Sequence, residues 1–404
     1  MTAIVKLELR NMAASLAVPI NPELLVWARE SAGYSVETAA AKLGIKHEKL
    51  DTIERGDTLP SFAQLKKAAD IYKRPLAVFF LPQAPERQMA VHDFRLQPGV
   101  SQRPYAPRLN TEIRQARLRR DDALDLAREI EQVTPSFKYR ATSDEKPEAV
   151  AMRVRQFLGI SLEQQYAIRR NEDALKAWKA AVEAQSVLIF ETSRIPQEEM
   201  RGVSLPADVL PIIILNGGDA HAGRIFTLLH ELTHLLLRQG GVCDMVSVEE
   251  GTPDARIEAF CNAVAGNVLV PADALLGAVA QKNDNAWTMD ELEDLARLFS
   301  VSRYVILRRL LTIGRTTQAH YRAISAKLDE EQQRAKEKPR DASAGGPPPS
   351  VMAVRNLGRP FVRLVLDAYA QDRIALATAS DYLGVKIKHL RRIESLVFGR
   401  EATS

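Results

Sequence analysis

Apolar side chains recur every three to four residues along most of this 404-residue chain, which is the spacing of amphipathic helices. In residues 21–82 the pattern breaks into five short segments. Asn21-Pro22 opens the first segment, because Asn caps a helix start and Pro is tolerated at its first position. Glycines close the first three segments, at Gly33, Gly44 and Gly56. The pattern predicts a five-helix N-terminal domain over residues 21–82.

The second and third segments are joined by a tight turn at Gly44, which is the arrangement of a helix-turn-helix. The residues of Ser35 to Ala40, Leu43 to Ile45, Leu50 to Gly56 and Pro60-Ser61 resemble the XRE-type helix-turn-helix of repressor proteins. The resemblance implies that five side chains of the second helix meet DNA, namely Lys46, His47, Lys49, Thr52 and Arg55. Three carboxylates on the same helix, Glu48, Asp51 and Glu54, oppose phosphate contact, so a protein-interaction role stays open.

Two polar segments divide the rest of the chain. Residues 83–109 are rich in Pro and Arg, and residues 327–350 are charged and then rich in Gly and Pro, so both are interpreted as linkers. Residues 110–326 lie between them and form the predicted central domain. After the second linker, residues 351–404 regain an apolar periodicity that predicts a small helical C-terminal module.

The central domain mixes helix and strand patterns. Residues 110–132, 148–158 and 172–185 have helical periodicity, and the first is so strongly charged that we expect a solvated face. Residues 186–190 and 209–215 are β-branched runs bounded by turns, as in strands. Pro211 indicates that the second strand starts late or lies at a sheet edge. The predicted fold class is therefore α+β and mostly α, with a small sheet in a helical, zincin-like central domain.

The apolar run from Phe226 to Leu237 contains the motif His230-Glu231-Leu-Thr-His234. Residues four apart share one face of a helix, so the two imidazoles can converge on one Zn²⁺ at about 2.0–2.1 Å from each nitrogen. Glu231 points to a neighbouring side, where it can act on a metal-bound water as a general base. Two His and a Glu are costly to bury in an apolar helix unless they are paired or bind metal. The motif therefore predicts a zinc site.

A catalytic zinc site needs a third protein ligand and one open position. Glu258 and Asn262 stand four residues apart on the next predicted helix, among small apolar residues. Glu258 would complete a set of two histidines and one carboxylate, and Asn262 is placed to orient it. Three acidic residues of the preceding polar segment remain alternative ligands: Glu249, Glu250 and Asp254.

The pattern Arg224-x-Phe-Thr-x-x-His230-Glu231-x-x-His234, followed by Glu258-x-x-x-Asn262 and Leu269-Val-Pro271, resembles the ImmA/IrrE metallopeptidase family. The similarity continues to Thr317 through the stretch from Leu295 to Leu310. It implies that His230, His234 and Glu258 hold zinc, that Glu231 is the catalytic base, and that Arg224 and Asn262 support the ligands. Thr233 departs from the Gly that many members have, and Thr is tolerated in a helix. The family implies limited cleavage of a regulatory protein, often a repressor.

The composition indicates which partners and which cellular compartment suit these domains. The net charge of +4 permits nucleic-acid contact without arguing for it. Two cysteines, Cys243 and Cys261, exclude a disulfide framework and fit a reducing compartment, and a small buried thiol is the expected role of Cys261. The first 20 residues lack the pattern of a secretory signal, and the sequence has no apolar stretch long enough to span a membrane. We expect a cytoplasmic protein.

The C-terminal module repeats the order of helix, glycine turn and helix over residues 377–393, with Gly384 at the turn. Five basic side chains lie near this turn: Lys386, Lys388, His389, Arg391 and Arg392. Such a segment is compatible with a second DNA-contacting element and equally with a small docking module.

Two functions remain open from the sequence. The first is a zinc-dependent endopeptidase that regulates transcription or a stress response by cutting a partner protein. The second is a non-catalytic transcriptional regulator or antitoxin of a toxin–antitoxin pair, in which zinc is structural and the partners are DNA or a toxin. The intact Glu231 favours the first. XRE domains often act as dimers, so we expect a homodimer. Four residues are candidates for oxyanion stabilisation: His221, Arg224, His320 and Tyr321.

Overall fold

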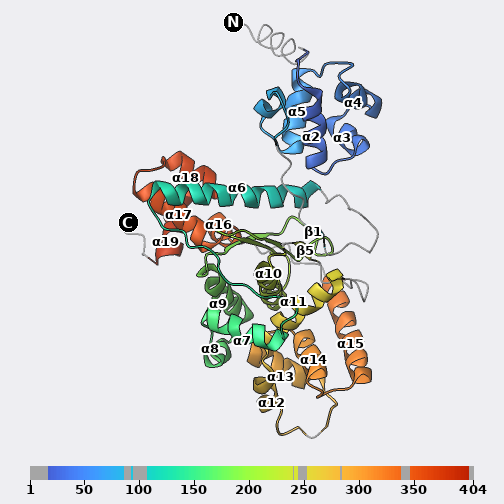
Figure 1. The fold of residues 1–404 in the computed structure, drawn as a ribbon, viewed down its shortest axis with the longest axis vertical. Coiled ribbons are helices and arrows are strands. Elements are labelled where there is room, and N and C mark those ends of the chain that lie inside the picture. Colours follow the sequence, from blue (N-terminus) through green and yellow to red (C-terminus); the bar gives the residue numbers. More distant parts are fainter. Residues whose placement is uncertain are drawn as a thin grey trace. The chain divides into compact units, whose positions relative to one another are not determined.

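A computed structural model describes residues 17–85, 92–93, 107–239, 241–243, 253–282, 284–337 and 346–399. The chain forms two compact units (Figure 1). The first comprises residues 1–90 and 102–115, and the second comprises residues 91–101 and 116–404. Helix α6 (Pro107–Glu129) contributes its first turns to the first unit and its remainder to the second.

The first unit is the predicted helix-turn-helix domain. It contains α2 (Pro22–Ser31), α3 (Val36–Leu43), α4 (His47–Glu54), α5 (Phe62–Tyr72) and the 3₁₀ helix η1 (Leu76–Phe80). The fifth predicted helix is thus a 3₁₀ turn. Asn21 and Ser35 accept hydrogen bonds from the backbone of Glu23 and Thr38 and so start α2 and α3. Gly44 ends α3 at φ 72°, a left-handed conformation that glycine adopts without strain.

The second unit contains a five-stranded sheet in the order β1-β5-β3-β4-β2. Its strands are β1 (His92–Asp93), β2 (Leu188–Thr192), β3 (Gly202–Leu205), β4 (Ile212–Asn216) and β5 (Gly241–Cys243). β2 and β4 are parallel, and β3 runs antiparallel to both β4 and β5. β4 begins directly after Pro211, so the prediction of a late start is confirmed, but the strand lies inside the sheet rather than at its edge.

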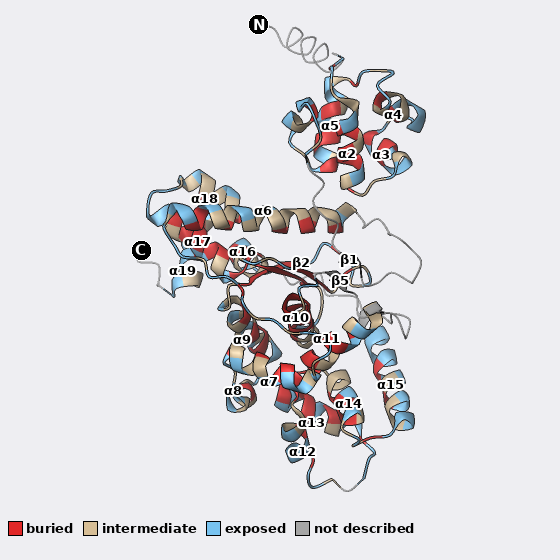
Figure 2. Ribbon diagram, viewed as in Figure 1, coloured by how far each residue is buried: buried red, intermediate tan, exposed pale blue. Residues whose placement is uncertain are grey.

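Helices cover both faces of this sheet. Ile189, Ile213 and Leu215 point into the main core together with Leu228 and Leu232 of α10 (His221–Leu236). Phe190 points to the opposite face, because side chains alternate along a strand, and meets Phe361 of α17 (Arg359–Ala370) edge to face. Figure 1 shows α10 and α16 (Pro349–Leu357) on opposite sides of the sheet. Every residue of β2, β3 and β4 is buried, and Figure 2 shows that most of α10 is buried as well.

The neighbour of α10 is α11 (Pro253–Leu269), and within the described residues seven further helices complete this part of the unit. They are α7 (Pro147–Leu158), α8 (Leu162–Ala167), α9 (Asn171–Glu183), α12 (Ala272–Ala278), α13 (Met289–Phe299), α14 (Arg303–Thr312) and α15 (Gln318–Glu337). α7 and α9 confirm the helices predicted for these stretches. In the described part of the chain no single helix could span a membrane, although α11 and α12 together, bent by 51°, reach the required length and composition.

The C-terminal helices are α16, α17, α18 (Leu376–Leu383), the 3₁₀ helix η2 (Ile387–His389) and α19 (Leu390–Phe398). α16 packs on β2 and α17 packs on α9, so these helices belong to the same compact unit as the sheet. Gly358, between α16 and α17, has φ 74° and ψ 150°, a conformation that only glycine adopts readily. A Cβ there would lie 2.7 Å from the Ile189 carbonyl oxygen, so this glycine permits the close approach to β2.

Candidate metal centre and helix-turn-helix surface

The predicted zinc ligands converge at one buried point between α10 and α11. The Nε2 atoms of His230 and His234 lie 3.1 Å apart. Glu258 reaches both histidines, with Oε2 at 3.3 Å from His230 Nε2 and Oε1 at 3.1 Å from His234 Nε2. Both histidines are fully buried and the Glu258 side chain is 10% exposed. Within the described residues these three form a group whose donor atoms could hold a metal ion.

The donor set fits a divalent metal. Bonds of about 2.0–2.1 Å in a tetrahedral site place ligand atoms about 3.3–3.5 Å apart, close to the separations seen between these three side chains. Two imidazoles and one carboxylate are also the ligand set of many catalytic zinc sites. Of the alternative third ligands, Glu249 and Glu250 lie outside the described residues, and Asp254 is not part of the converging group.

The histidines and Glu258 shift each other's titration. Burial acts to raise the pKa of Glu258, but hydrogen bonds from His230 and His234 hold it well below its usual range. Burial lowers the pKa of His234. At Cys261, on the same helix as Glu258, burial raises the pKa of the thiol, which keeps it neutral. Cys261 is a free, fully buried cysteine, as expected for a small packing residue.

Asn262 fixes the orientation of His230. Its Oδ1 lies 3.0 Å from His230 Nδ1. A proton on Nδ1 donates to this oxygen, which leaves the Nε2 lone pair facing His234 and Glu258. From the sequence, Asn262 is expected to orient Glu258, but in the structure it lies against His230 instead. The physical reason is the packing of α11 on α10, which brings Asn262 opposite the far side of the imidazole.

Gly202 of β3 lies against Glu231 and was not predicted. A Cβ at Gly202 would meet Glu231 Oε1 at 2.4 Å and Thr227 Cγ2 at 2.6 Å. The antiparallel strand β3 therefore passes so close to the metal-binding motif that only a glycine fits. The strand is four residues long and carries a single apolar pair, so it gave no sequence signal that would have located this contact.

Arg224 is part of a cluster of ion pairs around Glu191 and does not contact the histidines. Its Nη1 donates to Glu191 Oε2 at 2.6 Å, and Lys179 Nζ donates to Glu191 Oε1 at 2.6 Å. The Glu191 side chain is 1% exposed. Arg224 thereby ties the first turns of α10 to the end of β2, which holds the motif helix against the sheet.

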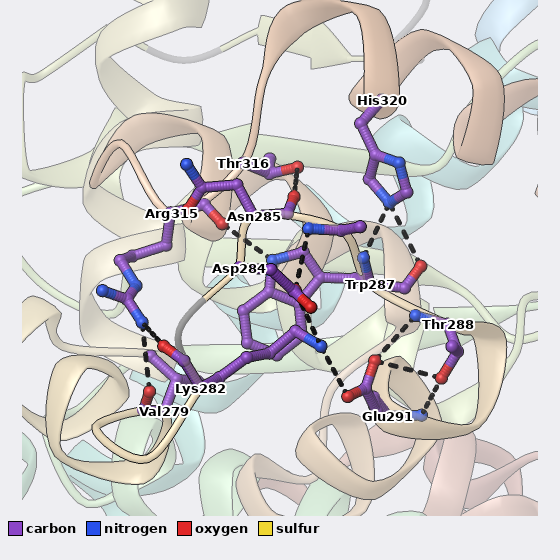
Figure 3. Close-up of polar contacts among 11 residues, drawn as sticks. Val279, Lys282, Asp284, Asn285, Trp287, Thr288, Glu291, Arg315, Thr316 and His320 are labelled. Atoms are coloured by element: carbon purple, nitrogen blue, oxygen red, sulfur yellow. Dashed lines mark hydrogen bonds and ion pairs between the residues drawn. The ribbon is translucent and has the colours of Figure 1, made fainter.

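His320 has a place in a polar cluster that fastens the segment before α13 (Figure 3). Its Nε2 accepts a hydrogen bond from the Trp287 backbone N–H at 2.9 Å. The Trp287 indole donates to the Arg315 carbonyl at 2.8 Å, and Lys282 pairs with Glu291 at 2.7 Å. These contacts give His320 a structural role in joining the start of α15 to this segment.

The predicted DNA-contacting residues lie on and beside α4. Lys46 precedes the helix and is exposed, and the His47 side chain is 56% exposed. Lys49 Nζ donates to Thr58 Oγ1 at 3.1 Å, and the Thr52 hydroxyl donates to the Lys49 carbonyl at 2.9 Å. Arg55 pairs with Asp51 at 2.7 Å. These side chains share one exposed surface, but two of its cations are engaged by neighbours.

Glu54 is removed from that surface. Its side chain is 6% exposed and receives two hydrogen bonds from Arg29 of α2, at 2.8 and 2.9 Å. This carboxylate braces α4 on α2 and does not oppose phosphate contact. Glu48 and Asp51 remain, so the exposed surface of α4 carries both signs of charge.

Comparisons with known proteins agree with this division. Residues 182–311 match the family model of the peptidases described as the IrrE N-terminal-like domain. Residues 23–78 match a family model described as a helix-turn-helix domain. No curated protein is similar enough to the chain to match it. The first match contains His230, Glu231, His234 and Glu258, and the second contains α2 to α5. Over these two stretches the chain is therefore similar to an IrrE N-terminal-like peptidase domain and, nearer the N-terminus, to a helix-turn-helix domain.

Proposed function

We propose that this protein is a cytoplasmic, zinc-dependent regulatory endopeptidase that cleaves a partner regulatory protein and binds DNA through its helix-turn-helix domain. The observation that carries the proposal is the placement of Glu231 on the same buried helix as two members of a converging His-His-Glu donor set. A purely structural site has no use for a carboxylate at that position. The XRE-like domain further supports a homodimer.

In the proposed mechanism, His230, His234 and Glu258 hold the zinc ion, which would polarise the scissile carbonyl and activate water. Asn262 keeps the His230 tautomer that leaves Nε2 free to bind. The Glu231 carboxylate takes a proton from the attacking water and returns it to the leaving nitrogen. Gly202 leaves the space that this carboxylate occupies.

A second candidate is a non-catalytic transcriptional regulator, or an antitoxin that binds a toxin. The burial of the site favours it, because His230 and His234 are fully buried, whereas a catalytic zinc site keeps one position open to water or substrate. In that case zinc would join α10 to α11, and the helix-turn-helix domain would perform the function alone.

Metal analysis combined with sequencing of new protein N-termini in cells tests the proposal. We expect about one zinc per wild-type chain, retained in Glu231→Gln and lost in His230→Ala and Glu258→Ala. New N-termini that appear with the wild type and disappear with Glu231→Gln would identify the cleaved partner. If Glu231→Gln keeps zinc, produces the same N-termini and regulates normally, the protein is not a peptidase and the regulator function replaces it.

A further inference from the structure

The C-terminal helices repeat the helix-turn-helix of the first unit at a constant spacing. Gly384 follows Gly44 by 340 residues, and the same spacing relates the main buried positions of the two segments. The buried pairs are Ala39 and Ala379, Leu43 and Leu383, Leu50 and Leu390, and Ile53 and Ile393. Each of these eight side chains is no more than 6% exposed. Because the buried positions match at a constant separation of 340 residues, the two segments have the same arrangement of helices and turn.

The backbones of the two turns agree closely. Gly44 has φ 72° and ψ 34°, and Gly384 has φ 61° and ψ 30°. The Ile45 N–H donates to the Ala40 carbonyl at 3.1 Å, and the Val385 N–H donates to the Ser380 carbonyl at 3.1 Å. Lys46 and Lys386 both precede the second helical segment, at φ −69° with ψ 149° and 146°. The C-terminal segment of residues 359–399, called the tail below, thus contains a complete helix-turn-helix.

The supporting helix is also present. α17 precedes α18 as α2 precedes α3, and Ala28 and Ala368, again 340 residues apart, are both fully buried. α17 packs on α18 and on α19, as α2 packs on α4. Three helices are enough to hold a recognition helix in place, as in homeodomains.

The charges of the two recognition segments differ. Where the first unit has Glu48 and Asp51, the tail has Lys388 and Arg391. Lys386 and Arg392 extend the same exposed surface, and its first carboxylate is Glu394. Within the described residues none of these four cations forms an ion pair, whereas Arg55 of the first unit pairs with Asp51. Exposed cations without intramolecular partners are available for phosphate.

An exposed apolar side chain lies within this basic surface. Ile387 is 49% exposed between Lys386 and Lys388. Apolar side chains on a recognition helix contact the methyl group of thymine in the major groove. The acidic side chains of α6 lie near α18, the helix before the turn: burial raises the pKa of Tyr382 on α18, and the charges of Asp122, Glu129 and Asp125 raise it further.

We propose that residues 359–399 form a second DNA-binding helix-turn-helix, in which Lys386, Lys388, Arg391 and Arg392 contact the phosphates and base edges of duplex DNA. This inference is independent of the peptidase proposal, because it uses none of the metal-site residues. It assigns the tail the more strongly DNA-binding surface of the two.

The test measures binding of the full-length protein to a random-sequence duplex of about three helical turns over a range of salt concentrations. The decisive variant carries Lys388→Glu with Arg391→Asp, the residues found at the matching positions of the first unit. We expect its affinity to fall at least about tenfold and the salt dependence of log Kd to lose about two units of slope. A conservative variant, Lys388→Arg with Arg391→Lys, should retain binding.

A matched control carries Arg322→Glu with Lys327→Asp on α15, where both side chains are exposed and the net charge changes equally. Zinc content and circular dichroism of every variant report whether the fold persists. If the tail variant binds duplex DNA as tightly as this control, or if a folded wild type prefers single-stranded RNA or an acidic protein to the duplex, the proposal is wrong. Loss of binding in the tail variant with zinc and fold intact supports it.

Discussion

Arg355 of α16 donates from Nε to Glu191 Oε2 of β2 at 3.0 Å, a contact between residues 164 positions apart in the chain. Its Nη2 also donates to the Gly217 carbonyl at 2.6 Å. Burial acts to raise the pKa of Glu191, but the charges of Lys179 and Arg224 lower it below its usual value. Arg355 therefore fastens the C-terminal helices to a carboxylate that is itself held by the motif helix α10.

Arg355→Met should lower the free energy of unfolding by about 2 kcal/mol, because Glu191 loses one of three cations and the Gly217 carbonyl loses its donor. Urea titration of the full-length protein measures the change. Arg363→Met is the control, since Arg363 forms an exposed pair with Asp367 worth about 0.5 kcal/mol or less. Equal effects of the two substitutions would show that the Glu191 cluster adds nothing to stability.

Glu183 should make stability fall with rising pH. Burial of its carboxylate, one oxygen of which lies beneath Gly358, raises its pKa to about 7. The folded state then keeps a proton that the unfolded state releases near its usual pKa of about 4.5. The free energy of unfolding therefore decreases by at most about 3 kcal/mol between pH 4.5 and pH 7, and it does not change further above pH 7.

Glu183→Gln should remove this decrease, which chemical denaturation at pH 5 and pH 8 detects. The matched control is Glu172→Gln at the start of the same helix, where a hydrogen bond to Lys176 lowers the carboxylate pKa. A wild type as stable at pH 8 as at pH 5 would contradict the assignment to Glu183.

Asn262→Ala should weaken zinc binding about 10- to 100-fold without abolishing it, because His230 keeps its place in the helix but loses the acceptor that selects its tautomer. Competition with a chromogenic chelator measures the affinity. Asn267→Ala serves as the control on the same helix, because Asn267 bonds Arg309 and lies away from the histidines. An equal loss in both variants would indicate a general disturbance of α11.

Gly202→Ala should reduce proteolysis at least about tenfold while zinc stays bound. The new methyl group overlaps Glu231 and Thr227 and must push the carboxylate out of position, but it does not approach the three ligands as closely. Zinc content and Glu231-dependent cleavage are measured on the same preparation. Full cleavage by this variant would mean that Glu231 works from another position.

The sequence predicted well where a pattern was long or chemically unusual. His230, Glu231 and His234 stood out because polar residues interrupt an apolar helix, and Glu258 because it stands alone among small residues. Gly202 could not be found, since its role depends on β3 passing beside α10, a contact that has no trace in local periodicity. The packing of α16 on β2 was equally hidden, because a Gly- and Pro-rich sequence precedes a stretch with an apolar pattern of its own. Pro211 predicted the start of β4 but not its position inside the sheet, because that position depends on pairing with β3.

The buried thiol of Cys261 can report how often the structure around the metal centre opens. Its thiol is fully buried three residues after Glu258, so a thiol reagent reaches it only when the packing around α11 opens locally. In a Cys243→Ser background the labelling rate of Cys261 reports the free energy of that local opening. Cys261 is thus a kinetic probe close in sequence to the ligand Glu258. Its labelling rate measures how strongly a bound metal suppresses local opening, and the measurement does not require that the substrate be known.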